Sequence, residues 1–231
     1  SARDTYWYES GYDLAYDWTD ELGHWAWEDV FEDPAGIAGR LSSALAADPV
    51  PGRVLRFLNN NDTGARFLTR YGPAANRAAA ALLLTLPGTP CIYTGDEVGA
   101  EFEPYGPPGV VDWDSDPYRL RTWYRDLCRL RSSHASLRAP HMAAADAEPA
   151  GGCYAYVRHG GEGDEPLLVV VNFSDEEAEV RVTVNHGFES LEGARSLEDV
   201  LNGGATPGCG AGIPVPAGAA RVLAEPTGGG R

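Results

Sequence analysis

Residues 53–71 read RVLRFLNNNDTGARFLTRY, and this stretch decides how the rest of the chain is interpreted. The apolar run VLRFL within it ends in three asparagines and a carboxylate, Asn59 to Asp62. A buried strand that ends in polar side chains is how an α/β enzyme delivers functional groups to the open end of its sheet. A strand followed by a simple Asx turn produces the same pattern. The stretch alone therefore leaves both interpretations open.

Two further short segments have the character of strands. Residues 12–18 alternate aromatic or apolar side chains with acidic or small ones, which is the period of a strand. Residues 89–93, TPCIY, run into TGDE at residues 94–97, so a second strand also ends in carboxylates. The segments at 54–58 and 89–93 are apolar on both faces, which is typical of parallel strands.

Helical patterns separate these segments. Asp33 and Pro34 provide a cap and a first-turn proline for a helix that precedes residue 53. Residues 74–86, AANRAAAALLLTL, are apolar nearly all round, as in a helix that is buried or packs on a sheet. Residues 120–130 repeat apolar side chains at helical spacing. This alternation of strands and helices predicts a parallel sheet with crossover helices.

The composition changes to Ala, Pro and Gly around residues 139–152, where we predict a domain boundary. We expect an α/β domain over residues 1–140, an all-β domain over 141–225 and a disordered tail at 226–231. Short strands are predicted in the second domain at residues 153–158, 167–173, 178–184, 195–201, 213–215 and 221–224. Their length and spacing predict a small antiparallel β-sandwich.

Charge and composition exclude several classes of partner. The chain has 231 residues and a formal net charge of −16, and all 18 basic residues are arginine. Such an acidic chain repels the phosphates of nucleic acids and anionic membrane surfaces, whereas a neutral sugar is indifferent to the field. No apolar run approaches the roughly 18 residues that a membrane span needs. Residues 1–20 have no apolar signal-peptide core, which leaves localisation unassigned and export open.

The four cysteines do not have the spacing of a metal site. Cys91 and Cys128 lie in apolar segments and are expected to be buried thiols. Cys153 and Cys209 share the C-terminal part, and the sequence leaves open whether they pair.

Residues 1–33 combine aromatic and acidic side chains. This combination suits carbohydrate binding and equally suits an aromatic core with solvated acids.

Four segments together resemble the C-terminal half of an alpha-amylase family glycoside hydrolase. They are RFLNNND at 56–62, ALLLTLPGTPCIYTGDEVG at 81–99, LCRLRSSHASLR at 127–138 and LLVVVNFS at 167–174. The resemblance extends over about residues 11–225. That family has a (β/α)₈ barrel followed by an antiparallel domain. The resemblance implies that residues 12–18, 54–58 and 91–93 are the sixth, seventh and eighth strands of such a barrel.

The same resemblance assigns roles to individual residues. Asp62 matches the carboxylate after the seventh strand, which stabilises a transition state with positive charge growing on the sugar ring. Asn61 stands where the family usually has a histidine that donates to a sugar hydroxyl, and an amide can also donate. We expect Arg66 to neutralise or orient Asp62 or to reach a substrate hydroxyl. Asp96 and Glu97 match the family's GDE and are expected to order loops at the site.

Two carboxylates of the family's site have no match in this chain. The nucleophilic Asp and the acid/base Glu follow the fourth and fifth strands, and retaining chemistry needs both about 5–5.5 Å apart. A (β/α)₈ barrel needs about 250 residues, whereas about 140 precede the predicted boundary. We therefore expect part of a retaining α-glucoside or α-glucan hydrolase or transglycosylase that is inactive alone. Its expected partners are a carbohydrate substrate and the missing N-terminal half of the barrel, as a separate or cleaved chain.

No cofactor is predicted. Calcium is common in the family, but we identify no ligand cluster for calcium in this chain.

Two alternatives to a glycosidase function stay open at this point. One is a non-catalytic carbohydrate-binding or regulatory relative of the family. The other is an α/β domain plus sandwich with no sugar function, in which Asp62→Ala would change nothing but local stability.

Overall fold

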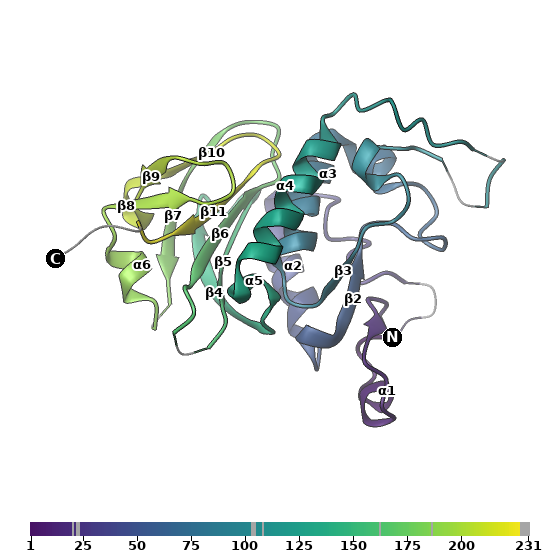
Figure 1. Ribbon diagram of the computed structural model, residues 1–231, viewed down its shortest axis with the longest axis horizontal. Coiled ribbons are helices and arrows are strands. Elements are labelled where there is room, and N and C mark those ends of the chain that lie inside the picture. Colours follow the sequence, from purple (N-terminus) through teal and green to yellow (C-terminus); the bar gives the residue numbers. More distant parts are fainter. Residues whose placement is uncertain are drawn as a thin grey trace.

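The computed structural model describes residues 1–19, 21, 24–102, 105–107, 109–161, 163–185 and 187–226. It contains a small parallel sheet and a larger antiparallel sheet, with helices between them (Figure 1). The predicted tail lies outside the described residues except for Pro226.

The parallel sheet has the order β1 (Ala15–Tyr16), β2 (Val54–Phe57), β3 (Thr89–Cys91). Both strand pairs are parallel, with Tyr16 opposite Leu55 and Phe57 opposite Cys91. The prediction of parallel strands joined by crossover helices is thus confirmed. Strand β1 is shorter than the segment predicted at residues 12–18.

Three helices follow or connect these strands: α2 (Ile37–Ala46), α3 (Phe67–Thr85) and α4 (Leu120–Ser133). A short helix α1 (Thr5–Glu9) lies near the N-terminus and α5 (Ala135–Arg138) follows α4. The helix expected from residue 74 is preceded by a helical segment that begins at Phe67, whose N–H donates to the Asn59 side chain. Gly72 interrupts α3 with φ 82° and ψ 172°, a conformation open to glycine.

Short 3₁₀ helices mark the turns at η1 (Pro34–Gly36), η2 (Pro51–Arg53), η3 (Asp96–Val98) and η4 (Cys209–Ala211). The turn from α3 to β3 passes close to the start of β2. A Cβ atom on Gly88 would lie 2.6 Å from the Val54 carbonyl oxygen, and the φ of Gly88 is 110°. Only glycine fits this crossing, which brings β3 alongside β2.

The C-terminal part forms one antiparallel sheet of eight strands in the order β10-β7-β4-β5-β6-β11-β8-β9. The strands are β4 (His141–Glu148), β5 (Cys153–His159), β6 (Leu167–Asn172), β7 (Ala178–Val184), β8 (Ser196–Asp199), β9 (Ala205–Pro207), β10 (Ile213–Val215) and β11 (Ala220–Ala224). A short helix α6 (Glu189–Gly193) connects β7 to β8. The outer strands β10 and β9 contact each other, so the sheet curls into a barrel-like form.

This single sheet differs from the expected sandwich of two layers. The difference arises at β4, whose sequence HMAAADAE lacks the β-branched and aromatic residues of a recognisable strand. Strand β4 pairs with β5 on one side and with β7 on the other, and thereby joins what would otherwise be two separate groups of strands.

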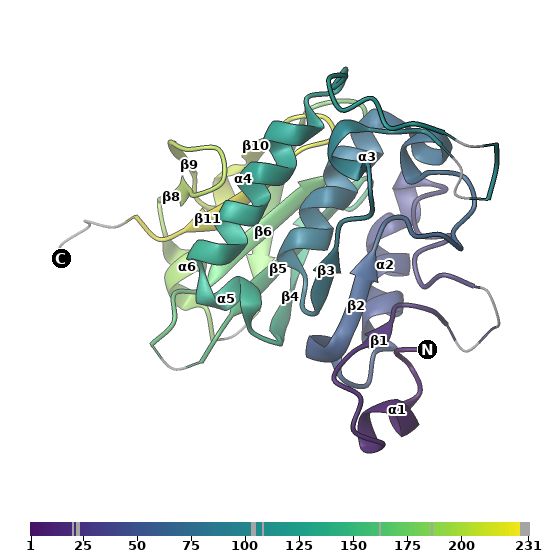
Figure 2. The same cartoon turned by 45° about the vertical axis from the view of Figure 1, so that its right-hand side comes forward.

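Helices α3 and α4 lie between the two sheets (Figures 1 and 2). One face of β5 and β6 places Tyr156 and Val169 in the same buried cluster as Phe57 of β2 and Leu83 of α3. The opposite face of these strands belongs to a second buried cluster, inside the curled sheet. The helix α3 is apolar nearly all round because both of its sides are covered.

All four cysteines are free thiols, including the buried Cys153 and Cys209, whose pairing the sequence left open. Cys91 and Cys128, expected to be buried, are half-buried.

Among the described residues, no helix is long and apolar enough to cross a bilayer. The same residues contain no group of three or more His, Cys, Asp or Glu side chains arranged to hold a metal ion.

Candidate active site

The carboxyl ends of β2 and β3 lie next to each other, and Asn59 connects them. Its side-chain Nδ2 donates to Asp96 Oδ1 at 2.8 Å, and its Oδ1 accepts from the Phe67 N–H at 2.7 Å. One asparagine thus joins the end of β2, the turn after β3 and the first turn of α3. This asparagine is the first polar residue after the apolar run, so the sequence places it where the strand ends.

A buried ion pair continues this connection. Arg66 Nη2 lies 2.7 Å from Asp96 Oδ1, and each side chain is 2% exposed. Arg66 also donates to the Thr94 carbonyl oxygen at 3.1 Å, and Asp96 Oδ2 accepts from the Tyr93 N–H at 3.0 Å. Burial raises the pKa of Asp96 to about 6, while Arg66 acts in the opposite direction. Asp96 therefore holds the loop after β3 to the start of α3.

The structure places Arg66 away from its expected partner. Its guanidinium lies against Asp96 and over the rings of Tyr93 and Phe102, at 5.2 and 5.0 Å from the ring centroids. No described contact joins Arg66 to Asp62. Glu97 is half-buried, and its Oε2 is buried without a hydrogen-bond partner among the described residues, as is Arg66 Nη1.

Asp62 and Asn61 are exposed at the end of β2, in a turn that Asn60 stabilises. Asn60 Oδ1 accepts from the Asp62 N–H at 2.7 Å, which is the Asx turn that the sequence offered as one interpretation. The two interpretations of this stretch are thus compatible, because the Asx turn itself places the Asp62 carboxylate near the end of the parallel sheet. Asp62 Oδ1 accepts from Asn61 Nδ2 at 3.0 Å and from the Tyr105 hydroxyl at 3.1 Å.

Tyr105 was not identified from the sequence. It lies 43 residues from Asp62 in a loop rich in Pro and Gly, and its side chain is 78% exposed. Its hydroxyl also accepts from Asn61 Nδ2 at 2.8 Å. No local pattern in the sequence signals this contact, because it depends on the path of the loop after β3.

A second buried charge cluster was also missed. Arg56 in β2 donates to Asp17 Oδ2 at 3.0 Å, to Asp48 Oδ2 at 2.7 Å and to the Pro87 carbonyl oxygen at 2.7 Å. Burial raises the pKa of Asp17 to about 6, against the effect of Arg56. An arginine inside an apolar strand was the available signal, since buried guanidinium groups need carboxylate partners. The cluster joins β1, β2 and the two turns that precede β2 and β3.

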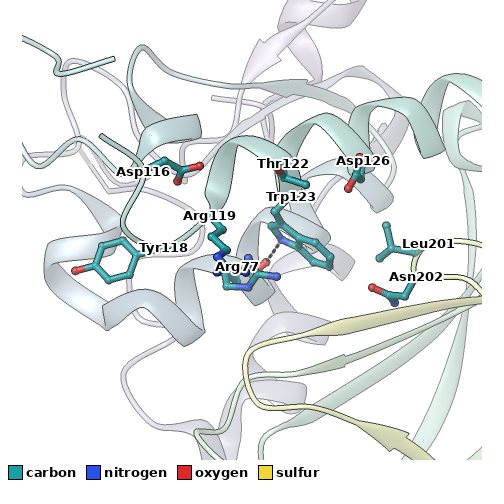
Figure 3. A pocket seen from close by; sticks show the side chains of 9 residues that line it. All are labelled: Arg77, Asp116, Tyr118, Arg119, Thr122, Trp123, Asp126, Leu201 and Asn202. Atoms are coloured by element: carbon teal, nitrogen blue, oxygen red, sulfur yellow. Dashed lines mark hydrogen bonds between the residues drawn. The ribbon is translucent and has the colours of Figure 1, made fainter. Parts of the chain in front are cut away.

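A further pocket lies elsewhere, beside α4 (Figure 3). It has a volume of about 680 Å³ and is lined by Arg77, Asp116, Tyr118, Arg119, Thr122, Trp123, Asp126, Leu201 and Asn202. The Trp123 ring is covered by Arg77 at 4.6 Å, and its Nε1 donates to the Arg77 carbonyl oxygen. Asp116 accepts from the first N–H groups of α4. These polar groups stabilise the helix, and Asn61, Asp62 and Arg66 are not among the lining residues.

Comparison with known proteins bears on this arrangement. No protein-family model matches the chain. The chain is 34% identical over 140 residues to a cyclomaltodextrinase of a Bacillus species, and this alignment covers 57% of the chain and 24% of the relative. The chain is a relative of the alpha-amylase family of glycoside hydrolases. The relatives also include the amino acid transporter heavy chain SLC3A2 of Oryctolagus cuniculus, 31% identical over 194 residues, covering 68% of the chain and 35% of the relative.

Solved structures of an alpha-amylase and of a debranching enzyme share the fold. The maltogenic alpha-amylase AmyB from Thermotoga neapolitana matches with a TM-score of 0.71 over 96% of the chain and 52% of the amylase, at 19% identity. An acarbose-soaked debranching enzyme from Nostoc punctiforme matches with a TM-score of 0.61 over 83% of the chain and 38% of the enzyme, at 25% identity. The aligned part of the chain covers between 24% and 52% of the length of these four proteins. Such partial coverage is consistent with the C-terminal portion of an alpha-amylase family enzyme.

Proposed function

We propose that the chain is the C-terminal part of a retaining α-glucoside or α-glucan hydrolase or transglycosylase, in which Asp62 stabilises the transition state. The observation that carries this proposal is the exposed Asp62 carboxylate at the carboxyl end of the parallel strand β2. In a (β/α)₈ barrel this end of the sheet is where catalytic side chains gather. Strands β1, β2 and β3 would then be the sixth, seventh and eighth strands of that barrel.

The chemistry of glycoside cleavage explains why a carboxylate is useful at this position. The transition state resembles an oxocarbenium ion, with positive charge on the sugar ring. A negative charge that is already oriented by Asn61 and Tyr105 stabilises that state without a reorganisation step. The nucleophile and the acid/base carboxylate would come from the part of the barrel that precedes these strands.

The parallel sheet supports a partner that completes it. Among the described residues, no strand pairs with the outer edge of β1 or of β3. Large apolar side chains next to these edges are exposed, including Leu14 at 39%, Tyr16 at 52% and Ile92 at 37%. Strand edges without a paired strand and exposed apolar side chains are the features that further strands would cover. On β1 the Tyr16 carbonyl oxygen already accepts from the Ala2 N–H, so part of that edge is occupied. We therefore propose the remaining strands of the barrel as the partner, and an α-linked glucoside as the substrate.

The test begins with the natural protein that contains this chain. Its intact mass and the N-terminal sequence of every polypeptide present identify the partner, and release of glucose units from maltodextrin measures activity. Asp62→Ala in this assembly should lower turnover on the order of a hundredfold or more, with folding intact because Asp62 is exposed. Asp175→Ala, another exposed acid in the turn before β7, is the matched control. Equal turnover of the two variants, or robust turnover by the pure isolated chain, contradicts the proposal.

A second candidate is a non-catalytic carbohydrate-binding or regulatory relative. It is favoured by the similarity to a transporter heavy chain, which extends over 68% of the chain. In this case the natural assembly would bind maltodextrin or a partner protein without cleaving any glucoside. Product analysis by chromatography after prolonged incubation distinguishes the two candidates.

A further inference from the structure

Asn61, Asp62 and Tyr105 form a closed ring of three hydrogen bonds. Asn61 Nδ2 donates to Asp62 Oδ1 at 3.0 Å and to the Tyr105 hydroxyl at 2.8 Å. The Tyr105 hydroxyl donates its only hydrogen to Asp62 Oδ1 at 3.1 Å. The amide nitrogen of Asn61 and the hydroxyl of Tyr105 act as donors, and Oδ1 of Asp62 accepts from both. The three side chains therefore orient one another.

The ring of hydrogen bonds is one-sided. Both donors contact Oδ1 of Asp62, and Oδ2 has no hydrogen-bond partner among the described residues. Two donors on one oxygen fix the plane of a carboxylate, while the second oxygen keeps its full capacity to accept. The amide nitrogen of Asn61 meanwhile donates to Asp62 and to Tyr105 within the protein.

We propose that Tyr105 is a positioning residue, which holds the Asp62 carboxylate so that Oδ2 accepts a hydrogen bond from a hydroxyl of the bound sugar. This assignment rests on the proposed function of Asp62. Tyr105 reaches the carboxylate from the loop after β3, whereas Asn61 and Asp62 follow β2. The loop and the strand end are thus connected through the side chain that carries the charge. A hydrogen bond to an anion is stronger than one between neutral groups. Removing only the Tyr105 hydroxyl therefore tests the contact with Asp62.

The first experiment tests the hydrogen bonds in the chain itself. The side-chain amide of Asn61 is observed by ¹H–¹⁵N NMR and assigned by its loss in Asn61→Asp. Tyr105→Phe keeps the ring and removes the hydroxyl, so the Asn61 amide signals should move. Tyr12→Phe removes the hydroxyl of another exposed tyrosine, 55% exposed, for which no hydroxyl hydrogen bond is found among the described residues. This control should leave the Asn61 signals in place.

The second experiment measures positioning in the chain assembled with the polypeptide that completes the barrel. Tyr105→Phe should lower kcat on maltodextrin about tenfold, the factor expected for one lost hydrogen bond to a charged group, with KM nearly unchanged. The melting temperature should equal that of Tyr12→Phe. A role in folding alone would lower the melting temperature and leave kcat intact.

Each outcome decides between the assignments. Unmoved Asn61 signals in Tyr105→Phe overturn the proposal, and so does a kcat equal to that of the Tyr12→Phe control. A wild-type assembly without turnover instead overturns the proposed function and the positioning role that rests on it, whereas the NMR comparison still reports whether the hydrogen-bonded ring exists. Moved signals together with a lowered kcat support the proposal.

Discussion

Replacing Arg56 by Met removes the guanidinium shared by two buried carboxylates. The Arg56 side chain is 2% exposed, and those of Asp17 and Asp48 are 1% exposed. Removing one partner of a buried ion pair typically costs about 3–5 kcal/mol, because the remaining charge has no compensation. Met has a similar volume, so little of this cost comes from a cavity. We expect the free energy of unfolding at pH 7 to fall by about 3–5 kcal/mol, and the melting temperature by about 10 °C.

Urea unfolding followed by circular dichroism at pH 7 and pH 5 provides the assay. Arg125→Met is the control, because Arg125 is 53% exposed and pairs with Asp126 on the surface, where an ion pair contributes about 0–1 kcal/mol. The cost of Arg56→Met should shrink at pH 5, where Asp17, with its pKa raised to about 6, takes up a proton and no longer needs a counter-charge. A cost equal to that of the control, or one that is the same at both pH values, would refute this reasoning.

Two further predictions concern the same strand ends. Asn59→Ala removes the donor to Asp96 and the acceptor for the Phe67 N–H, and should lower the free energy of unfolding by about 2–4 kcal/mol in urea titrations. Stability should also fall as the pH rises from about 4 to about 6. Burial raises the pKa of Asp17 and Asp96 to about 6, so the folded chain binds more protons than the unfolded chain in this range. Melting temperatures measured across that range would instead rise if these carboxyls had lowered pKa values.

The elements that the sequence predicts well are those whose burial pattern is local. The apolar run of β2 and the apolar residues on all sides of α3 can be recognised directly, because each pattern involves residues only a few positions apart in the sequence. The same holds for the polar residues that follow Phe57, since the end of an apolar run marks the end of a strand. These patterns were sufficient to find the parallel sheet and to place Asp62 at its edge.

The remaining features depend on contacts between distant parts of the chain. Strand β4 is built from alanines and is a strand because β5 and β7 pair with it on both sides. Arg66 faces Asp96 rather than Asp62, because the turn after β3 brings Asp96 within 2.7 Å of it. Tyr105 reaches Asp62 only through the path of a loop. Sequence spacing contains no information on such distances.

Helix α3 and the strands β5 and β6 share one buried cluster with β2, although they belong to opposite sides of residue 140. The Thr85 and Tyr156 hydroxyls, 2.6 Å apart, add a polar contact across the same interface. Neither sheet can lose its packing without exposing the apolar surface of the other. The chain should therefore unfold as one cooperative unit, and a protease cut near residue 140 should leave two pieces that stay together. The strand that precedes Asp62 accordingly packs, through Phe57, in one core with Tyr154 and Tyr156 of β5.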